Sequence, residues 1–374
     1  MPQALYDDAR HEPLTKAPWD EVAVRERIAA IVEDAETSMQ DGVWPNHPRD
    51  DDEEPPLLEG MTTVYLGAAG MLWALYALGS SLDLAPHVDA AVDRYRERPD
   101  WGEHAPGLLA GEGGILLVAV LLGGSPEHRD RLRDFVVANE RNPIWEVMWG
   151  SPGTMLAARA AGLDAEYERS AAILVEEWDA QDDGFWTQPL SRSGRPVKFV
   201  GPVHGFAGNV HALRGYLPDD ELRVRIEQPL RTVMVSEDGL VNWPPDVGSD
   251  ATRVQWCHGA PGIVITIGDL LPREQMLGGA ELTWRAGPLA KGAGLCHGTA
   301  GNGYALLRAH ELTGDDEWLD RARRFAMHAL EQVERAREQY GRGRFSLMTG
   351  DVGVALFAQS CLDVDARFPT MDRW

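Results

Sequence analysis

A Gly-x-x-Gly tetrad occurs seven times in this chain of 374 residues, and each copy opens an apolar stretch. The first glycines are Gly67, Gly111, Gly150, Gly205, Gly259, Gly298 and Gly350. The stretches that follow, such as "MLWALYAL" and "ILLVAVLL", are apolar nearly all round, which is typical of a helix buried on every side. Glycine suits helix starts where the backbone approaches a neighbour closely. The tetrads therefore predict seven buried helices.

Amphipathic stretches alternate with the apolar ones at a period of roughly 40 to 55 residues. Residues 86–101, 127–140 and 166–178 are examples, with charges on one face and aliphatic residues on the other. We expect an all-α fold, an α/α toroid of about seven inner and seven outer helices, with all seven tetrads at one end. One domain would span residues 1–374, with residues 1–59 as an N-terminal extension that includes the first outer helix, near 20–38. An open helical solenoid is the alternative, because repeats alone do not prove closure.

The charge balance restricts the partners. The formal net charge is −24, whereas nucleic acids and anionic membranes require clustered lysine and arginine. The sequence contains no apolar run of about 18 residues and its N-terminus lacks the features of a signal peptide. We therefore expect a cytoplasmic protein with no membrane span and no nucleic-acid partner.

Two of the three cysteines stand in nearly the same context, in "QWCHGAPG" and "GLCHGTAG", just ahead of consecutive tetrads. Ring closure would bring Cys257 and Cys296 together at one mouth. Zinc prefers thiolate and imidazole ligands, and a catalytic zinc site has three protein ligands and one open position. These residues point to Cys257, Cys296 and one of His258 or His297 as ligands, with two buried free thiols as the alternative. Cys361 is expected only to pack in a helix.

The motifs "WCHGAPG", "GLCHGTAGN", "HGFAGN" and "SLMTGDVGVALF" closely resemble those of the lanthionine synthetase C-like proteins, from about residue 60 onward. In that family the fold is an α/α toroid, and zinc is held by the Cys of the first motif and the Cys-His of the second. The resemblance thus implies Cys257, Cys296 and His297 as ligands of Zn2+ here, with His258 as a neighbour. The open position would receive a substrate thiol, which zinc keeps deprotonated at neutral pH.

The resemblance also implies further site residues. His204 directly precedes the fourth tetrad, and the matching histidine of the bacterial cyclases is a general acid or base. Arg253 matches their Arg-x-x-Trp-Cys pattern and could stabilise a developing enolate, or form a salt bridge that shapes the loop. Glu146 stands where the cyclases have aspartate, which puts its part in cyclisation in doubt. Lys291 matches the eukaryotic branch, where a lysine is implicated in handling phosphorylated substrates; a solvated loop cation is the alternative.

The implied activity is zinc-dependent addition of a thiol to dehydroalanine or dehydrobutyrine in a peptide or protein, which forms a thioether. The thiol would be glutathione, as the eukaryote-like features favour, or a cysteine of the same peptide, in which case a separate dehydratase must act first. A glutathione- or peptide-binding module with structural zinc is an alternative of another class. An α/α-barrel glycosidase needs two carboxylates at the mouth, and the sequence offers only Glu146 there.

Overall fold

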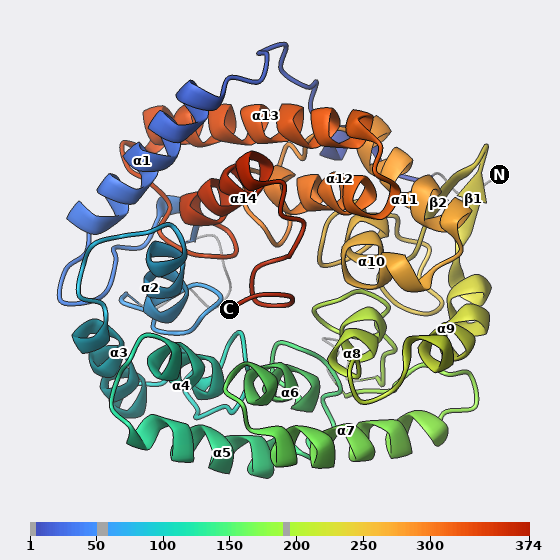
Figure 1. Ribbon diagram of the computed structural model, residues 1–374, viewed down its shortest axis with the longest axis horizontal. Helices are drawn as coiled ribbons and strands as arrows, with labels where there is room; N and C mark the ends of the chain where they lie inside the picture. The colour runs from blue at the N-terminus through green and yellow to red at the C-terminus, as the bar shows by residue number, and fades with distance from the viewer. Residues whose placement is uncertain (1–4, 51–58, 190–194) are drawn as a thin grey trace.

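The computed structural model describes residues 5–50, 59–189 and 195–374. Within these ranges the chain forms fourteen α-helices arranged as two concentric rings (Figure 1). Residues 1–4 and 51–58, which belong to the predicted N-terminal extension, lie outside the described residues. The expected all-α toroid is confirmed.

The inner ring consists of the seven apolar helices, and each begins directly after the first glycine of a tetrad, which is its N-cap. These helices are α2 (Ala68–Ala77), α4 (Glu112–Leu121), α6 (Ser151–Ala160), α8 (Phe206–Ala212), α10 (Ala260–Ile267), α12 (Thr299–Thr313) and α14 (Asp351–Asp363). The tetrad is therefore the start signal of an inner helix.

The outer ring consists of the amphipathic helices. They are α1 (Glu21–Thr37), α3 (Ala85–Glu97), α5 (Glu127–Asn139), α7 (Asp164–Asp179), α9 (Asp219–Val233), α11 (Arg273–Ala286) and α13 (Asp316–Tyr340). The described residues also form three short 3-10 helices, η1 (Asp8–Arg10), η2 (Pro48–Asp50) and η3 (Gly268–Leu270). One antiparallel hairpin joins β1 (Val235–Glu237) to β2 (Leu240–Asn242), and Val235 pairs with Asn242. Helix α1 confirms the outer helix predicted near residues 20–38.

The second glycine of each tetrad is required by a close approach of the backbone. A Cβ atom on Gly262 would lie 1.9 Å from the carbonyl oxygen of Trp256, and one on Gly301 would lie 1.8 Å from that of Leu295. In both cases the turn before the helix folds back under the first helical turn. Because any side chain would collide with this backbone, the tetrads fix how the mouth turns sit on the inner helices.

The inner ring is closed, because α14 contacts α2 as well as α12. The open solenoid is therefore excluded. The residue two positions before a tetrad also donates its backbone N–H to the carbonyl of the corresponding residue in the next mouth turn. Such hydrogen bonds run from Tyr65 to Leu109 (2.8 Å), Leu109 to Met148 (3.2 Å), Cys257 to Cys296 (3.2 Å), Cys296 to Met348 (2.8 Å) and Met348 to Tyr65 (3.3 Å). This belt holds most of the mouth turns in one ring.

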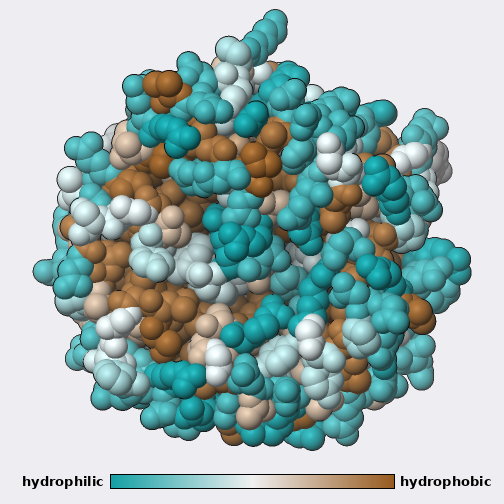
Figure 2. All heavy atoms as spheres, viewed as in Figure 1, coloured by the Kyte–Doolittle hydropathy of each residue, from teal (hydrophilic) through white to brown (hydrophobic). Residues whose placement is uncertain are grey.

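Residues 364–374, here called the closing segment, follow α14 and cross the middle of the ring (Figure 1). Phe368 stacks on Trp256, with ring centroids 4.3 Å apart and an angle of 14° between the planes. Trp374 packs edge-on against Trp73 of α2, at 5.7 Å. On the face seen in Figure 2, hydrophilic side chains gather at the centre of the ring, while hydrophobic areas lie to the left, over α2 and α4. The closing segment thus fills the lumen from this face.

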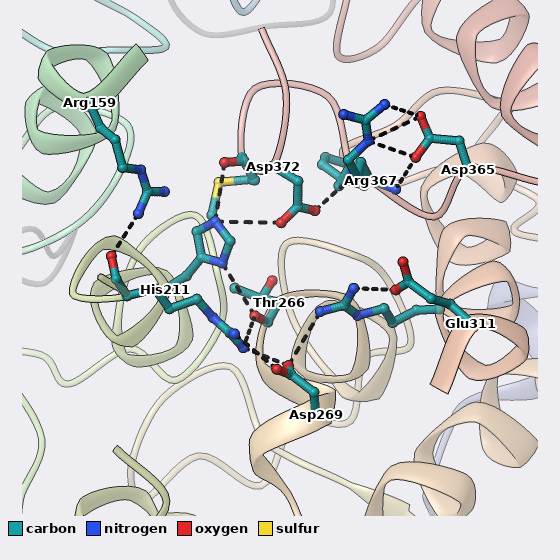
Figure 3. Close-up of polar contacts among 12 residues, drawn as sticks. Arg159, His211, Thr266, Asp269, Glu311, Asp365, Arg367 and Asp372 are labelled. Atoms are coloured by element: carbon teal, nitrogen blue, oxygen red, sulfur yellow. Dashed lines mark hydrogen bonds and ion pairs between the residues drawn. The ribbon is translucent and has the colours of Figure 1, made fainter. Parts of the chain in front are cut away.

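A polar network fastens the closing segment to the inner helices (Figure 3). His211 of α8 is buried, and its Nε2 lies 3.1 Å from the carbonyl oxygen of Met371 and 3.6 Å from Asp372 Oδ1. Its Nδ1 lies 3.4 Å from the carbonyl oxygen of Thr266 in α10. Burial is the largest influence on His211 and lowers its pKa. One histidine therefore links two inner helices to the closing segment.

Candidate metal centre and its surroundings

Cys257, Cys296 and His297 are brought together at the mouth of the toroid. Their potential ligand atoms all lie within 4.8 Å of one another. Both cysteines are buried and His297 is partly exposed. The cysteines stand two residues before their tetrads, in adjacent turns that are joined by the hydrogen bond from Cys257 N–H to the Cys296 carbonyl. Contact between the consecutive inner helices α10 and α12 thus places the two motifs side by side, as the sequence predicts.

The chemistry of this set fits zinc. A hydrogen bond from the Cys296 thiol holds the pKa of Cys257 well below its usual range, while that same bond to Cys257 and burial raise the pKa of Cys296. The two sulfur atoms are thus hydrogen bonded to each other, and this contact favours the thiolate form of one of them. Two sulfur atoms and one imidazole are the ligands that zinc prefers where a fourth position stays open.

Two further side chains contact the sulfur atoms, and sequence reasoning missed both. The Gln255 amide nitrogen lies 2.9 Å from Cys257 Sγ. The Tyr65 hydroxyl is hydrogen bonded to the Cys296 sulfur, and burial raises the pKa of this phenol well above its usual value, so it stays neutral. Tyr65 stands two residues before the first tetrad, as the cysteines stand before theirs. Aligning the seven mouth turns would have revealed it.

His204 and Glu146 form a pair next to the cluster. His204 Nδ1 lies 3.0 Å from Glu146 Oε2. The Glu146 carboxylate is fully buried and also accepts hydrogen bonds from three backbone amides of its own turn, those of Met148, Trp149 and Gly150. A carboxylate accepts only, so Nδ1 carries the proton and leaves Nε2 of His204 available. With so many partners, Glu146 can orient the histidine but cannot serve as a free acid, which argues against the glycosidase alternative.

The charge of Glu146 also tunes His204. Burial alone would lower the pKa of His204, but the hydrogen bond and charge of Glu146 outweigh it, with a smaller contribution from Cys257, so that the pKa is raised. His258 stacks on His204 at 5.9 Å between ring centroids, and burial lowers its pKa to about 4. His258 is thus a neutral neighbour of His204 that lies outside the ligand cluster.

Arg253 and Lys291 lie near different residues of the centre. The charge of Arg253 contributes to lowering the pKa of His258 and opposes the rise that burial causes in the pKa of Asp246, so its guanidinium lies near both. Lys291 is exposed and lines a small pocket together with Arg49, Arg344 and the ligand candidate His297. Both predicted cations therefore lie close to the centre.

A sequence model of the family described as "Lanthionine synthetase C-like protein" matches residues 26–373. Over 196 residues the chain is 32% identical to "LanC-like protein GCL1" of Arabidopsis thaliana, a match that covers 48% of this chain and 45% of that protein. Over 222 residues it is 30% identical to "Glutathione S-transferase LANCL1" of Danio rerio, covering 54% of this chain and 52% of that protein. The chain thus spans about half the length of the curated relatives it matches.

The fold is also similar to a solved structure, that of "Nisin cyclase". The two superpose with a TM-score of 0.59 at 15% sequence identity, over 91% of this chain and 93% of that one. At this identity the likeness concerns the fold. Among the described residues, no helix is long and apolar enough to cross a membrane.

Proposed function

The chain belongs to the lanthionine synthetase C-like family, and on that premise we propose that it adds a thiol to the β-carbon of a dehydroalanine or dehydrobutyrine residue. The observation that carries this proposal is one arrangement at the mouth. A Cys257–Cys296–His297 cluster suited to zinc lies beside His204, whose Nδ1 is bound to Glu146 and whose Nε2 is available. The cluster suits a sulfur nucleophile and the imidazole suits a proton transfer.

Zinc bound by these three ligands would supply a fourth position at which a substrate thiol is held as the thiolate at neutral pH. As the new C–S bond forms at the β-carbon, the electron pair of the double bond moves to the α-carbon and its carbonyl oxygen. The protonated His204 then gives its Nε2 proton to the α-carbon. The proton released by the thiol restores the histidine, so the overall reaction adds S and H across the double bond.

The other residues support these two events. Glu146 keeps His204 in the orientation and protonation state of a proton donor, because its charge raises the pKa of the imidazole. Arg253 lies near His258, which stacks on His204, and its fixed charge suits the developing enolate oxygen. Tyr65 and Gln255 hold the two sulfur atoms in place.

We favour glutathione as the thiol. The zebrafish relative is named a glutathione S-transferase. The pocket beside His297 is lined by Arg49, Lys291 and Arg344 in a chain whose net charge is −24, and of these three cations Arg344 is already paired with Asp50. Glutathione carries two carboxylates, which these cations suit. A phosphorylated residue of the acceptor peptide would suit the same cations.

Two substitutions test the proposal with a dehydroalanine peptide and glutathione, read by mass spectrometry, with bound zinc measured in parallel. His204→Ala should abolish adduct formation while one zinc per chain is retained, and Cys296→Ala should lose both. The exposed His104→Ala is the matched control and should behave as wild type. Unchanged adduct yield in His204→Ala would refute its role as proton donor. Full zinc occupancy in Cys296→Ala would refute the ligand set.

A further inference from the structure

The N-terminal segment, residues 5–16, packs against the loop that leads to Cys296. The backbone N–H of Glu12 donates to the Pro288 carbonyl (2.9 Å), and that of Ala290 donates to the Arg10 carbonyl (3.0 Å). The Glu12 carboxylate is hydrogen bonded to His328, Gln332 and Arg335. The two backbone hydrogen bonds hold Arg10 against the loop that leads to the metal centre, and the carboxylate contacts join the segment to α13.

The side chain of Arg10 reaches the centre through one intermediate. Its Nη2 donates to Gln255 Oε1 at 2.9 Å, and Gln255 Nε2 lies 2.9 Å from Cys257 Sγ. Gln255 is 4% exposed, so water cannot replace either bond readily. A single chain of hydrogen bonds therefore runs from the N-terminal segment to the sulfur of Cys257.

This chain of bonds has only one workable direction. A guanidinium group has donors and no acceptor, so the atom of Gln255 that faces Arg10 must be the amide oxygen. The amide NH2 must then face the sulfur of Cys257, to which it donates. Without Arg10, the amide could turn and place its oxygen against the Cys257 sulfur, which is a repulsive contact because a sulfur that ligates a metal has no proton to donate.

We propose that Arg10 is a positioning residue of the metal centre, which acts by holding the Gln255 amide in the orientation that donates to Cys257. The inference rests on the metal site of the proposed function. Groups that hydrogen bond to a metal ligand fix its geometry and electron density, and their loss typically costs about 10- to 100-fold in metal affinity. Residues of the N-terminal extension would thus serve a site whose ligands lie between residues 257 and 297.

The test measures zinc affinity of the full chain by competition with a chromophoric chelator, and the thiolate-to-metal absorption of the Co2+-loaded protein. Arg10→Met and Gln255→Leu should each weaken zinc binding about 10- to 100-fold and shift the absorption band. The double variant should be no weaker than Gln255→Leu alone, because Arg10 acts only through Gln255. Arg10→Lys keeps a cationic donor and should recover most of the affinity.

Two controls separate this role from general docking of the segment. Glu12→Gln removes the charge that pairs the segment with His328 and Arg335, but it keeps the two backbone hydrogen bonds at Glu12 and Arg10 and does not touch Gln255, and Arg25→Met removes an exposed arginine of α1. Both should bind zinc as wild type does. Unchanged affinity in Arg10→Met, additive losses in the double variant, or an equal loss in Glu12→Gln would overturn the inference. If the wild-type chain itself binds no zinc, the proposed function fails, which is a distinguishable result.

Discussion

Replacing Glu146 with glutamine perturbs the candidate proton donor without changing the size of the side chain. In the wild type, Glu146 Oε2 accepts from His204 Nδ1 at 3.0 Å and from the Met148 amide at 3.1 Å. In Glu146→Gln, an NH2 group replaces one of the two carboxylate oxygens. Each oxygen position faces at least one backbone N–H, so the NH2 group faces a donor in either orientation. The imidazole loses its charged partner, and one buried backbone amide loses its acceptor.

The size of the effect follows from these bonds. A hydrogen bond to a charged group contributes about 1.5–3 kcal/mol, and 1.36 kcal/mol corresponds to about one pKa unit. His204 is 24% exposed at its side chain, so solvent screens only part of this interaction. Glu146→Gln should therefore lower the pKa of His204, because the imidazolium loses an interaction of this size. The unsatisfied backbone amide should lower the free energy of unfolding by about 1–3 kcal/mol.

The assay is an NMR titration of the His204 imidazole nitrogens in wild type and variant, both loaded with the same metal, together with the pH dependence of thiol addition. Because the raised pKa extends the pH range over which His204 is protonated, activity should fall as the pH rises through that pKa. In Glu146→Gln this fall should begin at lower pH. An unchanged pKa of His204 in the variant would refute the argument that Glu146 sets its protonation.

Three further predictions concern stability, each read from urea unfolding. Gly262→Ala places a Cβ 1.9 Å from the Trp256 carbonyl oxygen and should lower the free energy of unfolding by about 1–3 kcal/mol or more; wild-type stability would show that the mouth turn can relax. Phe368→Ala removes the ring stacked on Trp256 and should cost about 3–5 kcal/mol, whereas a loss under 1 kcal/mol would mean that the closing segment is not part of the core. Burial lowers the pKa of His47 from 6.5 to about 4, so its contribution to the free energy of unfolding is present above pH 6.5 and is lost as the pH falls towards 4. His47→Gln should make the free energy of unfolding depend less on pH in this range, and an unchanged pH dependence would contradict this.

Much of the fold could be predicted because a Gly-x-x-Gly tetrad recurs once in every pair of helices. The tetrads mark every inner helix start, and the collision that a Cβ on Gly262 or Gly301 would meet shows why. Closure of the ring could not be read from the sequence directly, because it depends on the angle between successive helix pairs, and no local sequence pattern determines that angle. The closing segment was not predicted at all. Its contacts, such as Phe368 with Trp256 and His211 with Asp372, join residues far apart in the sequence and leave no local periodic signal.

The site divides in the same way. Cys257, Cys296 and His204 could be found because each stands one or two residues ahead of a tetrad. Only the family resemblance favoured His297 over His258 as the third ligand. The structure places His297 with the cysteines and stacks His258 on His204. Arg10 and Gln255 could not be found, because a hydrogen bond between residues 245 positions apart depends on how the N-terminal segment docks.

The most direct test of the central claim is mass spectrometry of a dehydroalanine-containing peptide incubated with the protein, zinc and glutathione, beside a metal-stripped sample. The account predicts a glutathione adduct that requires both the protein and the metal. A ring closed by a cysteine of the same peptide, without glutathione, would identify the peptide thiol as the substrate. An adduct that forms equally in the metal-stripped sample, or no thioether with either thiol while zinc is bound, would contradict zinc-dependent thiol addition and favour a binding module.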